Sequence, residues 1–185
     1  MRLPLFATIA LLAAGVAGAD PCRSGPRVNQ RPGPYISVVS TGQHRGQSHC
    51  FICEAADKPV VIIFARHLSD PLGKLVGKID KALARHKDAD LRAWVTFLAE
   101  DQTVLDPKVV DWSQRHAIGK IPLGVFDDTV GPPSYLLHRD ADVTVLLSVK
   151  QKVAFNFAYR AGELNDAAIG EIMKALPRIA AAAKK

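Results

Sequence analysis

The feature that most constrains the fold is a run of apolar, mostly β-branched residues from Val60 to Ala65. A continuous run of this kind predicts a strand buried on both faces, as in a parallel sheet. Asp70-Pro71 follows and favours the start of a helix. Apolar residues then recur at helical spacing as far as Leu83. A buried strand followed by an amphipathic helix predicts a sheet with helices packed on it.

The same alternation continues along the chain. Further strands are expected at 35–39, 91–98, 121–126, 143–149 and 152–159, and further helices at 106–116 and 165–176. Parallel neighbours require crossover connections, whereas the tight polar turn between the last two strands is typical of an antiparallel hairpin. The order therefore predicts an α/β domain. Its mixed central sheet has parallel core strands, a C-terminal antiparallel hairpin and helices on both faces.

The chain begins in the manner of a secretory signal peptide. Arg2 supplies a positive end, an apolar run extends from Leu5 to Val16, and Ala17-Gly18-Ala19 forms an A-x-A cleavage site. The apolar run is shorter than the ~20 residues that span a bilayer. We therefore expect cleavage after Ala19 and a secreted or periplasmic product with no transmembrane segment.

The composition divides the chain into four parts. We expect residues 1–19 to be the signal peptide, 20–34 an extended and mobile linker, 35–180 one domain, and 181–185 a basic tail. Pro, Gly and Arg dominate the linker without apolar periodicity. The formal net charge of +6 is spread along the chain, with no basic stripe interleaved with aromatic residues. This distribution argues against nucleic acid as a partner.

Four stretches carry a resemblance to a known superfamily: PVVIIFA, LRAWVTFLAED, IPLGVFDD and VTVLLSVKQKVAFNFAYRAGELNDAAIGEIMKAL. Their order, over roughly residues 58–177, is similar to that of thioredoxin-like proteins, and in its longer form to the peroxiredoxin and alkyl hydroperoxide reductase group. The resemblance implies a thioredoxin-like three-layer sandwich. It also implies thiol chemistry on protein thiols and disulfides or on a small oxidised molecule.

The chain departs from that superfamily at the reactive position. The superfamily has its reactive cysteine just after the first parallel strand, but here that stretch, Arg66 to Leu72, contains no cysteine. The usual mechanism at that position is therefore excluded. His67 lies in this stretch and is a candidate modulating residue or general base. Pro122 is a second candidate, because Ile121-Pro122 resembles the proline dipeptide beside the superfamily's active site.

The motif that could carry chemistry is the C-x-x-C pair of Cys50 and Cys53. In a helical turn, residues i and i+3 share one face, so the two sulfurs reach disulfide distance. Ser48 would cap such a turn and place Cys50 in its first turn. There the helix end and the neighbouring His49 would lower the pKa of the thiol. We therefore expect Cys50 to attack a substrate and Cys53 to act as the resolving thiol.

Two other interpretations of the cysteines stay open. The pair is an inert structural disulfide in a redox-silent binding domain, or Cys22 bridges to one member of the pair. Alternatively, Cys50 and Cys53 bind zinc or copper(I) with His44 and His49, although the adjacent His49 and Cys50 have difficulty pointing at one ion. The redox interpretation requires neither a metal nor a cofactor.

Overall fold

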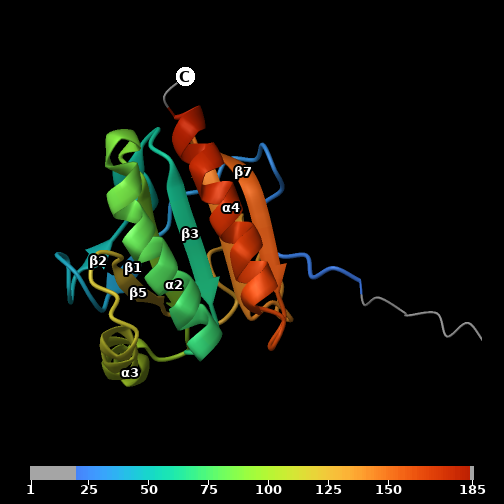
Figure 1. The fold of residues 1–185 in the computed structure, drawn as a ribbon. Helices are drawn as coiled ribbons and strands as arrows, with labels where there is room; N and C mark the ends of the chain where they lie inside the picture. The colour runs from blue at the N-terminus through green and yellow to red at the C-terminus, as the bar shows by residue number, and fades with distance from the viewer. Residues whose placement is uncertain (1–19, 184–185) are drawn as a thin grey trace, which may run out of the picture.

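The computed structural model describes residues 20–183 of the chain as one mixed sheet with helices packed on it (Figure 1). The predicted signal peptide, 1–19, and the last two lysines lie outside the described residues. The strands are β1 (Ser37–Val39), β2 (Ser48–His49), β3 (Val60–Ala65), β4 (Arg92–Leu98), β5 (Leu123–Phe126), β6 (Val143–Val149) and β7 (Lys152–Tyr159). The helices are α1 (Phe51–Ala55), α2 (Asp70–Leu83), α3 (Gln102–Arg115) and α4 (Asp166–Ala182), with 3₁₀ turns η1 (Ala84–Ala89) and η2 (Pro133–Tyr135).

The sheet runs in the order β2-β1-β5-β4-β3-β6-β7. β4 pairs in parallel with both β3 and β5, and helical crossovers connect these strands. β6 pairs antiparallel with β3, and β7 pairs antiparallel with β6. The predicted parallel core and C-terminal hairpin are therefore confirmed. Within residues 20–183, no helix has the length and apolar character that crossing a bilayer requires.

Both faces of the sheet carry helices, but unequally. Alternate residues of β3 point to opposite faces, so Ile63 packs under α2, α3 and α4 while Ile62 faces the other side. That second face is covered by α1, η2 and the chain around Tyr35. Figure 1 shows α2 and α4 lying side by side across the sheet. The three-layer sandwich is confirmed, with one layer made mostly of extended chain and a short helix.

Residues 20–34 are held against the sheet. The Ser24 hydroxyl bonds the Thr144 hydroxyl at 2.7 Å, and the Asn156 amide donates to the Ser24 carbonyl at 2.8 Å. The backbone N–H and C=O of Val153 bond the same segment at 2.9 and 2.8 Å. The segment has no regular secondary structure, as expected. These bonds replace the predicted mobile linker with a strap, because its backbone groups find partners on β7 and the Ser24 hydroxyl finds one on β6.

Capping side chains place two helix starts differently from the sequence prediction. α3 begins at Gln102 rather than at Asp106-Pro107, because the Asp101 carboxylate accepts two backbone N–H groups of the first turn at 2.8 and 3.3 Å. α2 is capped by the Ser69 hydroxyl, one residue before the predicted cap at Asp70. In each case the nearest polar side chain that reaches the free N–H groups decides the start.

Candidate functional site

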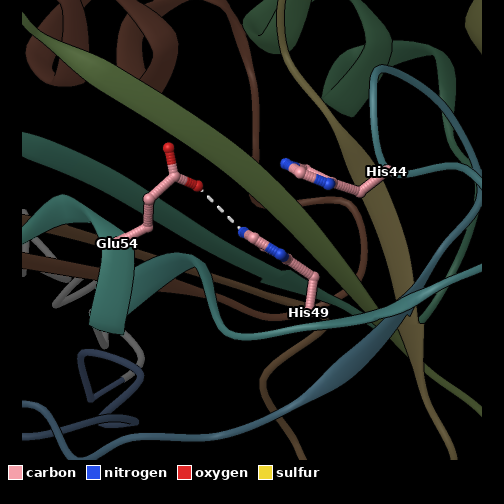
Figure 2. Close-up of side chains that lie close together, drawn as sticks. All are labelled: His44, His49 and Glu54. Atoms are coloured by element: carbon pink, nitrogen blue, oxygen red, sulfur yellow. Dashed lines mark hydrogen bonds and ion pairs between the residues drawn. The ribbon is translucent and has the colours of Figure 1, made fainter.

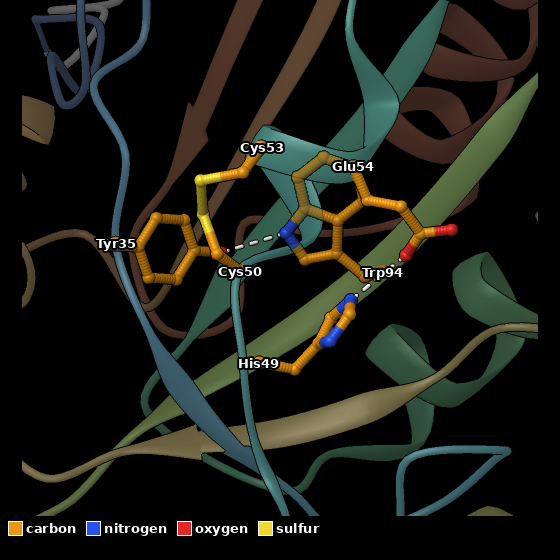
Figure 3. Close-up of a disulfide and its surroundings, with 6 residues drawn as sticks. All are labelled: Tyr35, His49, Cys50, Cys53, Glu54 and Trp94. Carbon is orange, nitrogen blue, oxygen red and sulfur yellow. Dashed lines mark hydrogen bonds and ion pairs between the residues drawn. A yellow bond between two sulfur atoms is a disulfide. The ribbon is translucent and has the colours of Figure 1, made fainter.

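Cys50 and Cys53 form a disulfide at the start of α1 (Figure 3). Their Cα atoms are 5.3 Å apart, which lies within the range in which a disulfide closes. The spacing predicted this bond, because residues three apart in a helical turn share one face. Cys53 is exposed, whereas Cys50 is half-buried. The pair is therefore accessible to a substrate mainly through Cys53.

The local backbone differs from the expected cap. Ser48 belongs to β2, where it pairs with Val38 of β1. It is therefore held in the sheet and does not cap α1. Cys50 itself is the N-cap residue, and no side chain caps the helix. α1 is five residues long, and its Phe51 ring stacks on Trp94 with ring centroids 5.7 Å apart. This packing fixes the one helical turn that carries the disulfide.

His49 bonds a carboxylate and not a sulfur. Its Nε2 atom lies 2.9 Å from Oε2 of Glu54 (Figure 2), and the other oxygen of Glu54 accepts a hydrogen bond from Arg92 at 2.8 Å. The His44 ring stacks on His49 with centroids 4.1 Å apart and an interplanar angle of 10°. Within residues 20–183, no side chain hydrogen-bonds to either sulfur of the disulfide. His49 therefore makes no hydrogen bond to Cys50 in the oxidised state, and its effect on the Cys50 thiol stays a prediction.

The pKa of Glu54 lies below its usual range, mainly because His49 bonds the carboxylate and also because Arg92 does; partial burial opposes both. A carboxyl with a depressed folded-state pKa stabilises the folded state above its unfolded pKa, and this stabilisation is lost as pH falls through the folded pKa. We expect Glu54→Gln to lose this pH-dependent contribution to the free energy of unfolding. Since Glu54 is exposed, the difference should stay under about 1 kcal/mol.

Urea unfolding from neutral pH to about pH 3 measures this difference. The midpoint of Glu54→Gln should fall less with acid than that of the wild type. Glu100→Gln, a change at another exposed glutamate, is the matched control. Parallel curves for wild type and Glu54→Gln would show that the His49 and Arg92 contacts do not shift the titration of Glu54.

A cavity of about 300 Å³ adjoins α1. Its apolar wall is formed by Phe51, Leu91, Trp94 and Pro122, and its polar wall by His44, Glu54, Arg92 and Lys120. Two of these residues, Phe51 and Glu54, belong to α1 itself. The same helical turn therefore presents its disulfide to solvent and its neighbouring side chains to the cavity.

The structure brings Pro122 to this site but not His67. Pro122 lines the cavity, whereas His67 lies beyond the far end of β3. Since β3 has six residues, its two ends are about 17 Å apart. His67 is 74% exposed and bonds Asp142 at 2.5 Å. Its position does not support the expected influence on the cysteine pair.

The end of β3, where the superfamily holds its reactive cysteine, is closed by an arginine. The Arg66 guanidinium donates to the carbonyl oxygens of Ala141 and His138 at 3.0 and 3.3 Å, and also to that of Thr129. These bonds tie the loops at that end of the sheet together. The cysteine pair lies instead at the opposite end, where β3 and β4 begin.

Cys22 takes no part in the disulfide. It remains a free, half-buried thiol, and burial raises its pKa. The alternative of a bridge from Cys22 to Cys50 or Cys53 is therefore wrong, because those two sulfurs bond each other.

A buried polar chain lies behind the disulfide. The Tyr35 hydroxyl accepts a hydrogen bond from the Trp94 indole at 2.8 Å (Figure 3) and bonds the Thr96 hydroxyl at 2.8 Å. Burial raises the pKa of Tyr35. Fully bonded polar groups of this kind fix side-chain positions in a core, so they hold Trp94 in place under α1.

Sequence reasoning missed Glu54 and Arg92. Glu54 directly follows Cys53, so the sequence alone indicates that it lies close to the pair. Its partner Arg92, however, is 38 residues away in the sequence. Arg92 is the first residue of β4, which pairs in parallel with β3. No local sequence pattern predicts that pairing. The one available signal was a charged residue at the start of an otherwise apolar strand.

No protein-family model and no curated protein sequence matches the chain. Solved structures do match it in fold. One is a candidate protein disulfide isomerase from Bacteroides thetaiotaomicron, with a TM-score of 0.60 and 18% identity over 83% of this chain and 93% of that one. Another is a secreted thiol-disulfide isomerase from Corynebacterium glutamicum, with a TM-score of 0.58 and 12% identity over 82% and 86%.

A yeast mitochondrial 1-Cys peroxiredoxin also matches, with a TM-score of 0.55 and 12% identity over 82% of this chain and 76% of that one. At such identities the likeness concerns the fold. It confirms that the chain has the predicted thioredoxin-like fold. The described residues combine this fold with a C-x-x-C disulfide that lies outside the usual reactive position.

Proposed function

We propose that this chain is an exported thiol-disulfide oxidoreductase that exchanges its Cys50–Cys53 disulfide with thiols of proteins or small molecules. The observation that carries the proposal is an accessible disulfide on a single helical turn of a thioredoxin-like domain. The secreted isomerase among the matching structures and the signal-like start of the chain support export. An exported setting would supply partners with oxidised and misoxidised thiols.

The exchange proceeds through a mixed disulfide. A substrate thiolate attacks the sulfur of Cys53, the more exposed residue of the pair, and Cys50 leaves as a thiolate that takes up a proton. A second substrate thiolate then attacks the substrate sulfur of the mixed disulfide and releases Cys53. The substrate gains a disulfide, and the pair gains two electrons. This order reverses the roles expected from the sequence, because Cys53 is the more exposed residue of the pair.

The spacing of the two cysteines favours exchange over a structural role. In the chain-entropy description, a disulfide that closes a loop of only four residues contributes about 2 kcal/mol, the low end of what such bonds supply. The buried apolar residues already form a large core on each face of the sheet. A bond within one helical turn adds little to such a fold, whereas it keeps two thiols together in the reduced state.

The redox potential of the pair tests the proposal. We expect the Cys50–Cys53 disulfide to equilibrate with glutathione at a potential between about −120 and −270 mV, the range of catalytic dithiols. Thiol alkylation at a series of glutathione ratios, read by mass spectrometry, gives this value. The measurement uses Cys22→Ser, so that only the pair titrates.

A potential well below about −300 mV would assign the pair to a structural disulfide. An insulin-reduction assay provides the activity readout, and the same reduced protein can be offered peroxide. Peroxide would oxidise the dithiol to the disulfide and leave as an alcohol and water. The peroxiredoxin among the matching structures makes peroxide the second oxidant to test.

A further inference from the structure

We propose that His44, His49 and Glu54 form a binding site for a divalent ion of the zinc type. Figure 2 shows the His44 ring beside the His49 ring, which bonds the Glu54 carboxylate. One ligand atom from each residue can be chosen so that all three lie within 4.8 Å of one another. The site uses neither sulfur, so it stands independently of the proposed thiol exchange.

The donor set selects the class of ion. Imidazole nitrogen suits Zn²⁺, Cu²⁺ and Ni²⁺, whereas Mg²⁺ and Ca²⁺ prefer oxygen ligands alone. Zinc binds nitrogen and oxygen at about 2.1 Å, so two ligands of a tetrahedral ion lie about 3.4 Å apart. From a largest separation of 4.8 Å, each ligand atom must move by less than about 1 Å. One of the stacked rings must also turn to aim its lone pair at the ion.

The backbone already holds these residues close together. His44 lies in the loop between β1 and β2, which is closed by bonds from Gly46 N–H to the Val39 carbonyl at 2.7 Å and from Gln47 N–H to the His44 carbonyl at 3.0 Å. Gly46 has a φ of 78°, a conformation that a glycine adopts without strain. His49 ends β2, and Glu54 follows on α1. Little chain ordering therefore opposes binding.

Arg92 supplies the supporting contact that a ligating carboxylate needs. It donates to Oε1 of Glu54, while His49 bonds Oε2. An ion would replace the His49 contact at Oε2 and leave the Arg92 bond in place to orient the carboxylate. The positive charge of Arg92 is offset in part by Asp90, whose carboxylate lies 3.5 Å from its Nε. The cavity lined by His44 and Glu54 provides room for a water as a fourth ligand.

The test is a zinc titration of the untagged protein with its disulfide formed. Isothermal titration calorimetry is expected to show one Zn²⁺ per chain, and an equal concentration of Mg²⁺ should not compete. Loss of supporting contacts alone costs 10–100-fold in metal affinity in known sites. We therefore expect His44→Ala, His49→Ala and Glu54→Gln each to weaken binding by at least about tenfold. His138→Ala, at an exposed histidine outside the site, should bind as the wild type does.

Two further measurements keep the test decisive. Ring-nitrogen NMR shifts on adding Zn²⁺ should appear at His44 and His49 and not at His138. The double variant Cys50→Ser/Cys53→Ser should retain zinc, which separates this site from one made by the thiols. Wild-type affinity in His44→Ala would overturn the proposal even if His49→Ala failed to fold. Loss of zinc in the cysteine variant with full binding in Glu54→Gln would also overturn it.

Discussion

Cys53→Ser is expected to abolish thiol-disulfide exchange, and Cys50→Ser to arrest it at a mixed disulfide. Cys53 is the exposed member of the pair and Cys50 is half-buried, so a substrate reaches Cys53 first. Without Cys50, no neighbouring thiol can release the mixed disulfide that forms at Cys53. Because a neighbouring group acts at a very high effective concentration, turnover should fall by at least about a hundredfold in either variant.

The measurement uses reduced protein and a small disulfide such as glutathione disulfide. Mass spectrometry should find a stable adduct on Cys53 in Cys50→Ser and little adduct on Cys50 in Cys53→Ser. Cys22→Ser is the matched control and should exchange as the wild type does, since Cys22 lies outside the disulfide. Rapid adduct formation on Cys50 in Cys53→Ser would restore the roles predicted from the sequence. Full turnover in both variants would show that the Cys50–Cys53 pair does not carry the proposed exchange.

The longer strands were predictable because their signal is local, whereas the two-residue β2 was not among the expected strands. A continuous apolar run such as Val60–Ala65 can be buried on both faces only in a covered sheet, and all six of its residues are buried. The same holds for the helix that ends at Leu83 and for the cap at Asn165, whose side chain accepts from a backbone N–H of the first turn at 3.0 Å. Each of these features depends on residues close in sequence.

The placement of the cysteine pair was not predictable because it depends on distant pairing. β1 lies beside β5, with Val38 opposite Val125, and α1 is held beside the first half of β4 by the Phe51–Trp94 and Glu54–Arg92 contacts. No local pattern distinguishes that end of the sheet from the other, where His67 lies. The strap at residues 20–34 was missed for a related reason. The strap is held to the sheet by hydrogen bonds. Such contacts require no apolar periodicity, so the sequence shows no pattern that predicts them.

Asp80→Ala is expected to destabilise the fold strongly, by roughly 2–4 kcal/mol. Asp80 lies in α2 and is 7% exposed. Its Oδ1 accepts the backbone N–H groups of Lys120 at 2.7 Å and Ile121 at 2.9 Å, just before β5. Ile121 is 2% exposed, so water cannot readily replace the lost acceptor at its N–H. A buried donor left without a partner costs about 1–3 kcal/mol, and bonds to a charged acceptor are the stronger kind.

Asp80→Asn separates the loss of the hydrogen-bond acceptor from the loss of its charge, because it keeps an acceptor oxygen and removes the charge. We expect it to cost about half as much as alanine, since hydrogen bonds to a charged group contribute about twice those to a neutral one. Urea unfolding followed by fluorescence of the buried Trp94 and Trp112 measures both variants. An unchanged midpoint in Asp80→Ala would mean that the turn before β5 is held by its apolar contacts. Since Lys120 lines the cavity beside α1, this carboxylate also fixes one wall of the candidate site from the opposite face of the sheet.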